Sequence, residues 1–354
     1  MIRLSYGFLA LLILLASCAD SKDETEKPTS PRIRKHTSVA APSQNQNFTR
    51  GMAIPMEIQS SEEFAIDSIQ VTIGEETTTY YEQTFEVNIP TRKVGSWRIL
   101  AKVFNGESSE THYRSIIVLP ESAPEEYGYE IVNTYPHDTE DYTQGLLIKD
   151  GKLYESSGQR GKSTLKMKNL TTGATEKVVN LNSDLFGEGL TVYNDEFYQL
   201  TWTSGEGFVY NDQLEQLRTF SYQVQGWGLT TLGDELVLTD ESEKLYFMEP
   251  SSFTVIRELQ VYDNTGKVDA LNELEVIDGL IYANVYQEDY IVVIDPETGE
   301  VLQKIDCTGL LTDSEAQAAD VLNGIAIDES TGSIYITGKW WPKLFEVTFQ
   351  PKTI

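Results

Sequence analysis

Short runs of alternating hydrophobic and polar residues fill the chain from about residue 50 to residue 120. Clear examples are residues 68–73 (SIQVTI), 84–89 (TFEVNI) and 98–103 (RILAKV). Alternation with a period of two is typical of β-strands that bury one face. Several short strands separated by turn residues predict a small immunoglobulin-like β-sandwich over residues 46–122. We find no catalytic cluster in this region and interpret it as a spacer.

The remainder of the chain, residues 127–354, repeats one pattern five times. Each copy opens with a small or polar turn, enters a short apolar strand, turns at Asp, Gly or Asn, and enters a second strand. The equivalent positions, spaced about 44, 39, 45 and 51 residues apart, are Gly145, Gly189, Gly228, Glu273 and Gly324. This period suits a four-stranded propeller blade.

The last copy lacks a strand, because only residues 344–349 follow Trp341 as a strand-like run. Residues 129–134 (YEIVNT), before the first copy, can supply it and close the ring. The longest spacing contains residues 312–322 (TDSEAQAADVL), which predict an inserted helix. The sequence therefore predicts an all-β chain with a five-bladed β-propeller over residues 127–354.

The first residues form a targeting segment. The apolar run at residues 8–15 is too short to cross a bilayer but fits the core of a signal peptide. The stretch Leu15-Ala16-Ser17-Cys18 resembles a bacterial lipobox, which implies cleavage before Cys18 and lipid on its sulfur. We therefore expect a lipoprotein signal peptide (1–17), a polar flexible tether (18–45) and a lipid-anchored location in the bacterial cell envelope. An ordinary signal peptide that contains a cysteine is the alternative.

Charge and rare residues exclude several classes of protein. The chain has 55 acidic and 27 basic residues, a net charge of −28, so nucleic acid is not an expected partner. Its two cysteines, Cys18 and Cys307, are not expected to pair, and Cys307 is interpreted as an inert buried thiol. Three histidines in all argue against histidine-based catalysis and most zinc sites.

The turns that open each copy are expected to meet at one mouth of the ring, where repeat proteins often bind ligands. Equivalent positions there carry different residues, as an asymmetric site for a small ligand requires. The candidate residues are Tyr142, Gln144, Phe186, Glu188, Trp227 and Asn272 from these turns, with Trp202, Tyr286 and Lys339 from the ends of second strands. The alternative is that the aromatic residues merely plug the channel.

These segments resemble the plant and bacterial type of glutaminyl-peptide cyclotransferase. The resemblance rests on YTQGL from Tyr142, FGEGL from Phe186, YQLTW from Tyr198, GWGL from Gly226, LNELE from Leu271 and GKWWPK from Gly338. It implies a propeller enzyme, an acyltransferase without cofactor or catalytic metal. Such an enzyme converts the N-terminal glutamine of peptides to pyroglutamate and releases ammonia. Many relatives carry Phe in place of Tyr142 and Trp in place of Tyr286, which bears on fine specificity.

The resemblance also implies roles. Glu188, in FGEGL, matches the catalytic glutamate, and burial beside Phe186 should raise its pKa to suit a proton shuttle. Asn272 and Gln144 can bind polar groups of the substrate, and Lys339 can stabilise a developing oxyanion. The aromatic residues would wall the pocket, namely Tyr142, Phe186, Trp202, Trp227 and Tyr286. Glu273 and Glu275 are interpreted as structural or as facing the channel.

Two other functions stay open at this point. A metal-dependent propeller lactonase would hold calcium with oxygen ligands such as Glu188, Asn272, Asn323 and Asp240. A non-catalytic surface binding module would use the same ring without turnover. The animal type of glutaminyl cyclase, a zinc enzyme on an α/β fold, is excluded because no matching ligand set or βαβ pattern is present. We expect a monomer whose partners are peptides with N-terminal glutamine.

Overall fold

The structure is a computed structural model that describes residues 35–89 and 92–352. The expected signal peptide (1–17) and lipidation site Cys18 lie outside these residues. Within them, no helix is both long and apolar enough to span a membrane.

Residues 37–119 form two β-sheets that share one hydrophobic core. One has the order β1 (Thr37–Ala41), β3 (Ile54–Ser60), β6 (Thr84–Val87). The other has the order β2 (Gln46–Thr49), β8 (Ser108–Leu119), β7 (Gly95–Asn105), β4 (Ser68–Ile73), β5 (Glu76–Tyr80). The alternation read from the sequence has its expected cause, because every second side chain of β4 is buried.

Strand β1 begins earlier than expected, inside the stretch 18–45 that the sequence predicts as a flexible tether. It pairs with β3, and its Thr37 and Val39 side chains are buried. The Glu110 carboxylate accepts hydrogen bonds from the backbone N–H and the hydroxyl of Thr37. These long-range contacts stabilise a strand whose own composition is polar, and the expected boundary at residue 46 is therefore wrong.

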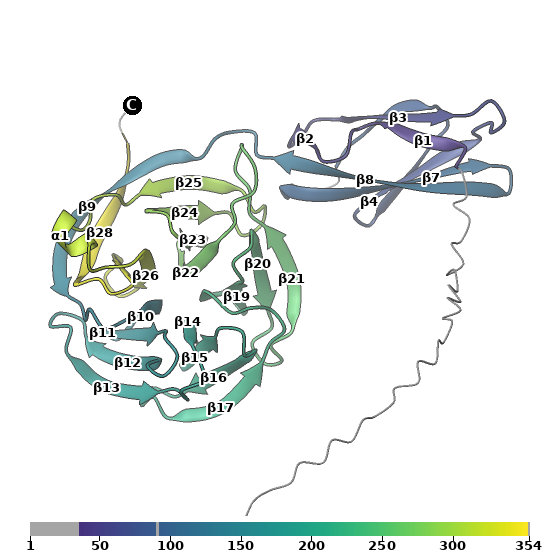
Figure 1. Cartoon of the computed structure of the whole chain (residues 1–354). Helices are drawn as coiled ribbons and strands as arrows, with labels where there is room; N and C mark the ends of the chain where they lie inside the picture. Colours follow the sequence, from purple (N-terminus) through teal and green to yellow (C-terminus); the bar gives the residue numbers. More distant parts are fainter. Residues whose placement is uncertain (1–34, 90–91, 353–354) are drawn as a thin grey trace, which may run out of the picture. The chain divides into compact units, whose positions relative to one another are not determined.

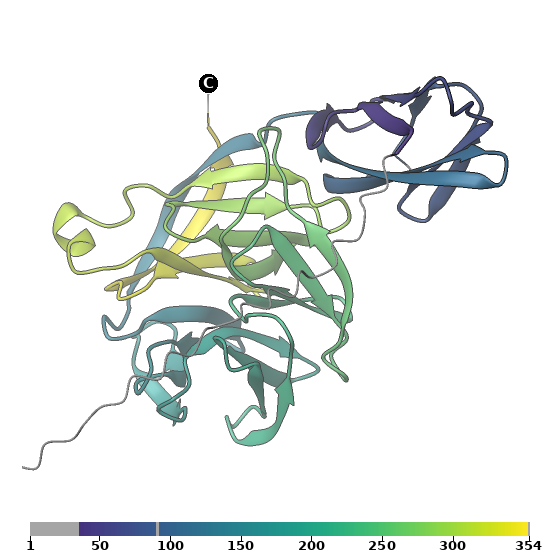
Figure 2. The same ribbon diagram turned by 45° about the vertical axis from the view of Figure 1, so that its right-hand side comes forward.

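Beyond residue 124 the chain forms three four-stranded antiparallel sheets and one eight-stranded sheet around a common centre (Figures 1 and 2). The first sheet is β10 (Thr143–Lys149), β11 (Lys152–Ser157), β12 (Thr164–Asn169), β13 (Thr175–Asn180). The second is β14 (Gly187–Tyr193), β15 (Glu196–Thr201), β16 (Glu206–Tyr210), β17 (Gln216–Ser221). The third is β18 (Leu229–Leu232), β19 (Glu235–Thr239), β20 (Lys244–Met248), β21 (Val255–Gln260). This is a propeller-like arrangement.

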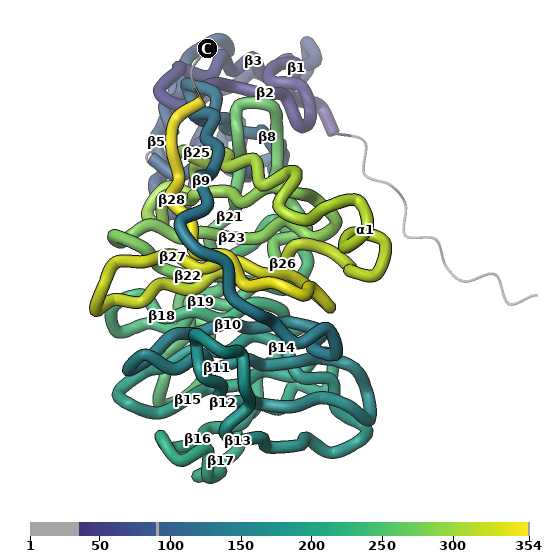
Figure 3. Tube along the Cα trace, turned by 90° about the vertical axis from the view of Figure 1, so that its left-hand side faces the viewer, coloured from purple at the N-terminus to yellow at the C-terminus, as the bar shows by residue number. Residues whose placement is uncertain are grey.

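The eight-stranded sheet joins the first and last strands of this region. Its order is β22 (Leu271–Ile277), β23 (Leu280–Val285), β24 (Tyr290–Ile294), β25 (Val301–Asp306), β9 (Glu125–Pro136), β28 (Lys343–Pro351), β27 (Ser333–Gly338), β26 (Leu322–Asp328). The long strand β9 pairs antiparallel with β28 over most of its length, as expected for residues 129–134 (Figure 3). Its first residues also pair parallel with β25. This second pairing, which the sequence does not predict, fuses two expected sheets into one.

The helix expected at 312–322 is a single turn, α1 (Asp313–Ala316). A capping box between Thr312 and Glu315 starts it. It ends early because the following backbone pairs with Lys339, the residue after strand β27. The Asp320 N–H donates to the Lys339 carbonyl, and the Lys339 N–H donates to the Val321 carbonyl.

The innermost strands β10, β14, β18, β22 and β26 contact one another in cyclic order. Their close approach explains the repeated glycine. A Cβ atom on Gly228 would lie 2.0 Å from the Asn272 carbonyl oxygen, and one on Gly189 would lie 2.5 Å from the Leu229 nitrogen. Glu273 stands at the equivalent position in β22, and its carboxylate accepts from the N–H groups of Leu146 (3.2 Å) and Ile325 (2.8 Å). Glu273 thus connects three of the innermost strands.

Candidate active site

A cavity of about 340 Å³ opens where the innermost strands begin and their neighbouring strands end. The nine residues selected from the sequence all line it: Tyr142, Gln144, Phe186, Glu188, Trp202, Trp227, Asn272, Tyr286 and Lys339. Gln159 and Glu241 complete the lining. The cavity therefore combines aromatic walls with two carboxylates, three carboxamides and one ammonium.

Irregular strand starts aim the polar side chains into this cavity. Ladder pairing shifts register between Thr143 and Gly145 in β10, and between Gly187 and Leu190 in β14. The same shift recurs in β22 and β26. The polar residues that begin these shifts are Gln144, Glu188, Asn272 and Asn323, and the shifts in β14, β22 and β26 also contain Gly189, Glu273 and Gly324. A β-bulge re-aims the side chain of the unpaired residue, so one irregularity, repeated around the ring, collects the polar groups.

Glu188 lies at the buried end of the cavity, with 4% of its surface exposed. Its Oε1 accepts a hydrogen bond of 2.9 Å from Nε2 of Gln144. Burial raises the pKa of the Glu188 carboxyl well above its ordinary value, and the positive charge of Lys339 opposes this only partly. A raised carboxyl pKa suits a group that both accepts and donates a proton in a reaction.

Lys339 is the buried cation of the site, with 2% of its surface exposed. Its Nζ lies 4.8 Å from the ring centre of Tyr142 and 5.0 Å from that of Tyr286. Burial lowers the pKa of Lys339 to about 8, while the charges of Glu188 and Asp320 act in the opposite direction. Two aromatic faces thus hold an ammonium group that titrates near physiological pH.

A carboxamide behind the cavity fixes the orientation of Gln144. Nδ2 of Asn323 donates to the Thr143 carbonyl (2.9 Å) and to Oε1 of Gln144 (3.3 Å). With its oxygen accepting from Asn323, the Gln144 amide must direct its NH₂ group at Glu188. Across the cavity, Oδ1 of Asn272 is buried and has no hydrogen-bond partner among the described residues. A buried acceptor without a partner is costly, so a donor on a bound ligand would satisfy it.

The aromatic residues of the cavity wall pack against one another in edge-to-face contacts, which fix the orientation of their rings. Phe186 packs edge-on against Tyr142, with ring centres 6.2 Å apart, and against Trp202 at 5.8 Å. Trp227 packs against Tyr286 at 5.5 Å. These ring contacts give the cavity a largely aromatic wall beside Glu188 and Lys339.

Three neighbours of the site were missed in the sequence, Gln159, Glu241 and Asp320, and Asn323 was considered there only as a calcium ligand. Gln159 and Glu241 follow second strands and have left-handed backbones, with φ of 96° and 80°. Gln287 and Trp340 occupy the same place in other copies and are also left-handed, so the repeat itself marked these positions. Asn323 orients Gln144, and the Asp320 charge acts on Lys339. Asp320 lies in the insertion, where no repeat signal could identify it.

The calcium set considered from the sequence is not assembled. Asp240 accepts from Ser242 and from the Tyr246 hydroxyl (2.8 Å) and does not line the cavity. In the described part of the chain, one group of three metal-type residues has its donor atoms within 4.8 Å: His137, Asp141 and Glu155. Lys168 Nζ donates hydrogen bonds to both carboxylates of that group. The lysine ammonium therefore occupies the place that a metal ion would take.

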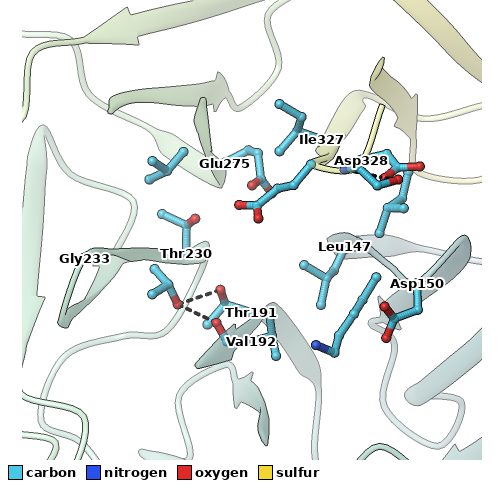
Figure 4. A pocket seen from close by; sticks show the side chains of 15 residues that line it. Leu147, Asp150, Thr191, Val192, Thr230, Gly233, Glu275, Ile327 and Asp328 are labelled. Atoms are coloured by element: carbon cyan, nitrogen blue, oxygen red, sulfur yellow. Dashed lines mark hydrogen bonds between the residues drawn. The ribbon is translucent and has the colours of Figure 1, made fainter. Parts of the chain in front are cut away.

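A larger cavity of about 570 Å³ lies at the opposite end of the innermost strands (Figure 4). Its lining includes Glu275, Asp328 and Asp150, and the Thr231 hydroxyl there bonds Thr191 and the Val192 carbonyl. It contains none of the nine selected residues. The aromatic rings, the lysine and the oriented amides occur together only at the smaller cavity among those described here.

A ring of β-sheets with a buried carboxyl group, a lysine and carboxamides in its aromatic mouth defines an all-β, propeller-like enzyme for a small polar substrate group. Comparison with known proteins is consistent with this class. The model of the family described as glutamine cyclotransferase matches residues 99–349, and the chain belongs to this family. The match begins within β7, earlier than the residue 127 suggested by the motifs.

Two relatives support the assignment. The glutaminyl-peptide cyclotransferase of Arabidopsis thaliana is 38% identical over 224 residues, covering 62% of this chain and 70% of its own length. The crystal structure of Myxococcus xanthus glutaminyl cyclase is similar with a TM-score of 0.60 and 36% identity, covering 65% of this chain and 100% of that chain. The chain is therefore an enzyme of the glutaminyl-peptide cyclotransferase type.

Proposed function

We propose that the enzyme converts the N-terminal glutamine of peptides to pyroglutamate with release of ammonia, without a catalytic metal, and that Glu188 moves the proton. The observation that carries this proposal is the buried Glu188 carboxyl. It accepts a hydrogen bond from Gln144 and interacts electrostatically with the ammonium of Lys339. The reaction is intramolecular, so the main task of the site is to hold the folded substrate.

Substrate binding follows from the polar groups that are still free to bond. The unpartnered Oδ1 of Asn272 accepts an N–H of the substrate. The ammonium of Lys339 faces the γ-carbonyl oxygen and stabilises its developing negative charge. The rings of Phe186, Trp202 and Trp227 enclose the aliphatic part of the glutamine side chain.

The chemical step needs one proton to move. The α-amine, with an ordinary pKa of about 7.7–8.0, attacks the γ-carbonyl carbon, and the bond to the amide nitrogen then breaks. Glu188 takes a proton from the attacking nitrogen and delivers it to the leaving nitrogen, which departs as ammonia. One carboxyl group with a raised pKa serves as base and then as acid.

The test is turnover of a peptide with N-terminal glutamine, followed by ammonia release and loss of mass, with and without EDTA. We expect activity that EDTA leaves unchanged and that falls by about 10²–10⁴-fold in Glu188→Gln. A wild-type enzyme that is inactive on such peptides would refute the proposal. Activity lost in EDTA and restored by a divalent cation would instead support the metal-dependent alternative.

For the rest of the chain we propose the organisation expected from the sequence. The catalytic region is a five-bladed propeller, the two-sheet region is an immunoglobulin-like spacer, and the enzyme is a monomer. Lipid on Cys18 anchors it in the bacterial cell envelope. Cys18→Ser should move the protein from the detergent-rich to the aqueous phase in detergent partitioning, and an unchanged distribution would contradict the anchor.

A further inference from the structure

A group of buried charges lies directly behind the segment that carries Tyr142 and Gln144. Glu155 accepts hydrogen bonds from Lys168 Nζ (2.5 Å) and Thr143 Oγ1 (2.6 Å), and its Oε1 lies 3.1 Å from Nε2 of His137. Asp141 accepts from the same Lys168 ammonium. The side chains of His137, Asp141, Glu155 and Lys168 are each at most 2% exposed. We call these four residues the ion cluster.

Both ring nitrogens of His137 face oxygen acceptors, which favours its protonated form. Its Nδ1 lies 2.8 Å from the Trp341 carbonyl oxygen, which can only accept, so Nδ1 carries a proton. Its Nε2 faces Glu155, whose pKa the nearby cations hold well below its ordinary value despite burial, so Nε2 donates as well. Burial lowers the pKa of His137, but the charge and hydrogen bond of Glu155 outweigh this and raise it. Two buried carboxylates therefore face two buried cations, and the Lys166 ammonium at the edge of the cluster also pairs with Asp141 (2.5 Å).

The same residues join two segments of the chain through backbone contacts. The Trp340 N–H donates to the Asp141 carbonyl (2.7 Å), and the His137 N–H donates to the Pro342 carbonyl (3.0 Å). The Thr143 hydroxyl, which bonds Glu155, also lies 3.3 Å from the Gly338 carbonyl oxygen. Residues 137–143 are thus bonded to residues 338–342 at the point where the first and last copies of the repeat meet.

Both joined segments enter the cavity. The first leads into Tyr142 and Gln144, and the second contains Lys339. Buried ion pairs contribute little net stability compared with apolar packing of the same volume, so stability alone does not account for four buried charges here. We propose that the ion cluster positions the active site by holding residues 141–144 against residues 338–341, so that Gln144 and Lys339 keep their places on either side of Glu188. Its members act as positioning residues.

The effect on the reaction follows from distance. The Gln144 Nε2 to Glu188 Oε1 bond is 2.9 Å, and a displacement of about 1 Å can cost on the order of 10²-fold in rate. Loss of the Gln144 bond and of the nearby Lys339 charge also removes two influences that favour the Glu188 anion. A loosened cluster would therefore move the acid limb of the pH profile of kcat/KM to higher pH.

The experiment compares Glu155→Gln with the wild type and with Ile294→Ala, a control that opens a cavity in the fully buried side of β24 far along the ring. All kinetics are run well below the Tm of each variant. We expect Glu155→Gln to lower kcat/KM by about tenfold and to raise the midpoint of the acid limb, while Ile294→Ala loses Tm but stays within about twofold of wild-type kinetics. Thr143→Val keeps every charge and should lower kcat/KM and raise the midpoint of the acid limb by smaller amounts. This variant keeps the test possible if Glu155→Gln does not fold.

The kinetic measurements depend on the proposed function, because they need a substrate that the enzyme turns over. A crystal structure of Glu155→Gln tests the inference without that assumption. In that structure the Gln144 amide should leave hydrogen-bond distance of Glu188. A variant with lower Tm but unchanged kinetics, unchanged acid limb and unchanged Gln144 position would overturn the inference and leave a purely structural cluster. If the wild type does not turn over glutamine peptides, the proposed function fails, and the position of Gln144 still decides the inference.

Discussion

Glu188 and Lys339, both buried in the lining of the cavity, influence each other's charge. Burial acts on both in the direction of the neutral form, raising the pKa of Glu188 and lowering that of Lys339 to about 8. Their mutual attraction opposes burial in both cases. The competent pair, a carboxylate beside an ammonium, is lost when Glu188 gains a proton or Lys339 loses one. The substrate α-amine, which must be neutral to attack, adds its own titration to the acid limb.

This pair predicts a bell-shaped pH profile of kcat/KM with a basic limb near pH 8. Lys339→Met removes a charge that favours the Glu188 anion, so the pKa of Glu188 should rise and the acid limb should move to higher pH, while the basic limb due to Lys339 disappears. Lys339→Arg, which keeps the charge, should move the acid limb less. An acid limb unmoved in Lys339→Met would show that another group titrates there.

Asn323 is expected to matter through Gln144. Asn323→Leu removes the donor to Oε1 of Gln144, so the amide can rotate and present its oxygen to Glu188. We expect kcat/KM to fall by about tenfold, measured together with Tm. A fall in Tm with kinetics at the wild-type level would assign Asn323 to stability alone.

Among the elements, the irregular starts of the innermost strands decide where the site lies. A regular strand would alternate its side chains between the two faces of its sheet. The register shifts in β10, β14 and β22 instead turn Gln144, Glu188 and Asn272 toward the central channel. Gly145 and Gly189, which directly follow Gln144 and Glu188, permit the close approach of the next strand.

That close approach predicts a strong effect of one methyl group. Gly228→Ala places a Cβ 2.0 Å from a backbone oxygen of β22, so the free energy of unfolding should fall by about 3 kcal/mol. The control is Gly279→Ala, where nothing lies within 4 Å and only the left-handed φ of 78° is strained; it should cost about 1 kcal/mol. Equal losses in urea unfolding would contradict the packing explanation.

For the whole molecule, the pairing of β9 between β25 and β28 joins the beginning of the catalytic region to its end. The ion cluster lies at the same closure, since His137 directly follows β9 and bonds Trp341 beside β28. Strand pairing and the ion cluster therefore join the same two ends of the region.

Stability should consequently depend on pH through His137. Because its pKa is raised in the folded state, the stabilisation is fully present below the unfolded pKa of about 6.5 and is lost as pH rises through the folded pKa. Each pKa unit of difference corresponds to about 1.4 kcal/mol. The free energy of unfolding of the wild type should thus fall above pH 6.5 relative to His137→Gln. Parallel curves for the two proteins would mean that folding does not change the pKa of His137.

The amino-acid sequence by itself determined the all-β class, the strand that completes the last copy and the nine residues of the cavity. Those features are repeated or local: hydrophobic alternation, turn residues, and family motifs such as FGEGL that keep their order along the chain. The glycine positions could be aligned from the sequence alone because each copy of the repeat imposes the same packing requirement.

Only the tertiary structure decided the rest. The sandwich begins at Thr37 because Glu110, far along the chain, bonds that strand. The fusion of two sheets through β9, the orientation of Gln144 by Asn323 and the ion cluster likewise join residues separated by long stretches of chain. Local propensity carries no information on such pairings, because they are stabilised only once the tertiary fold brings the distant residues together.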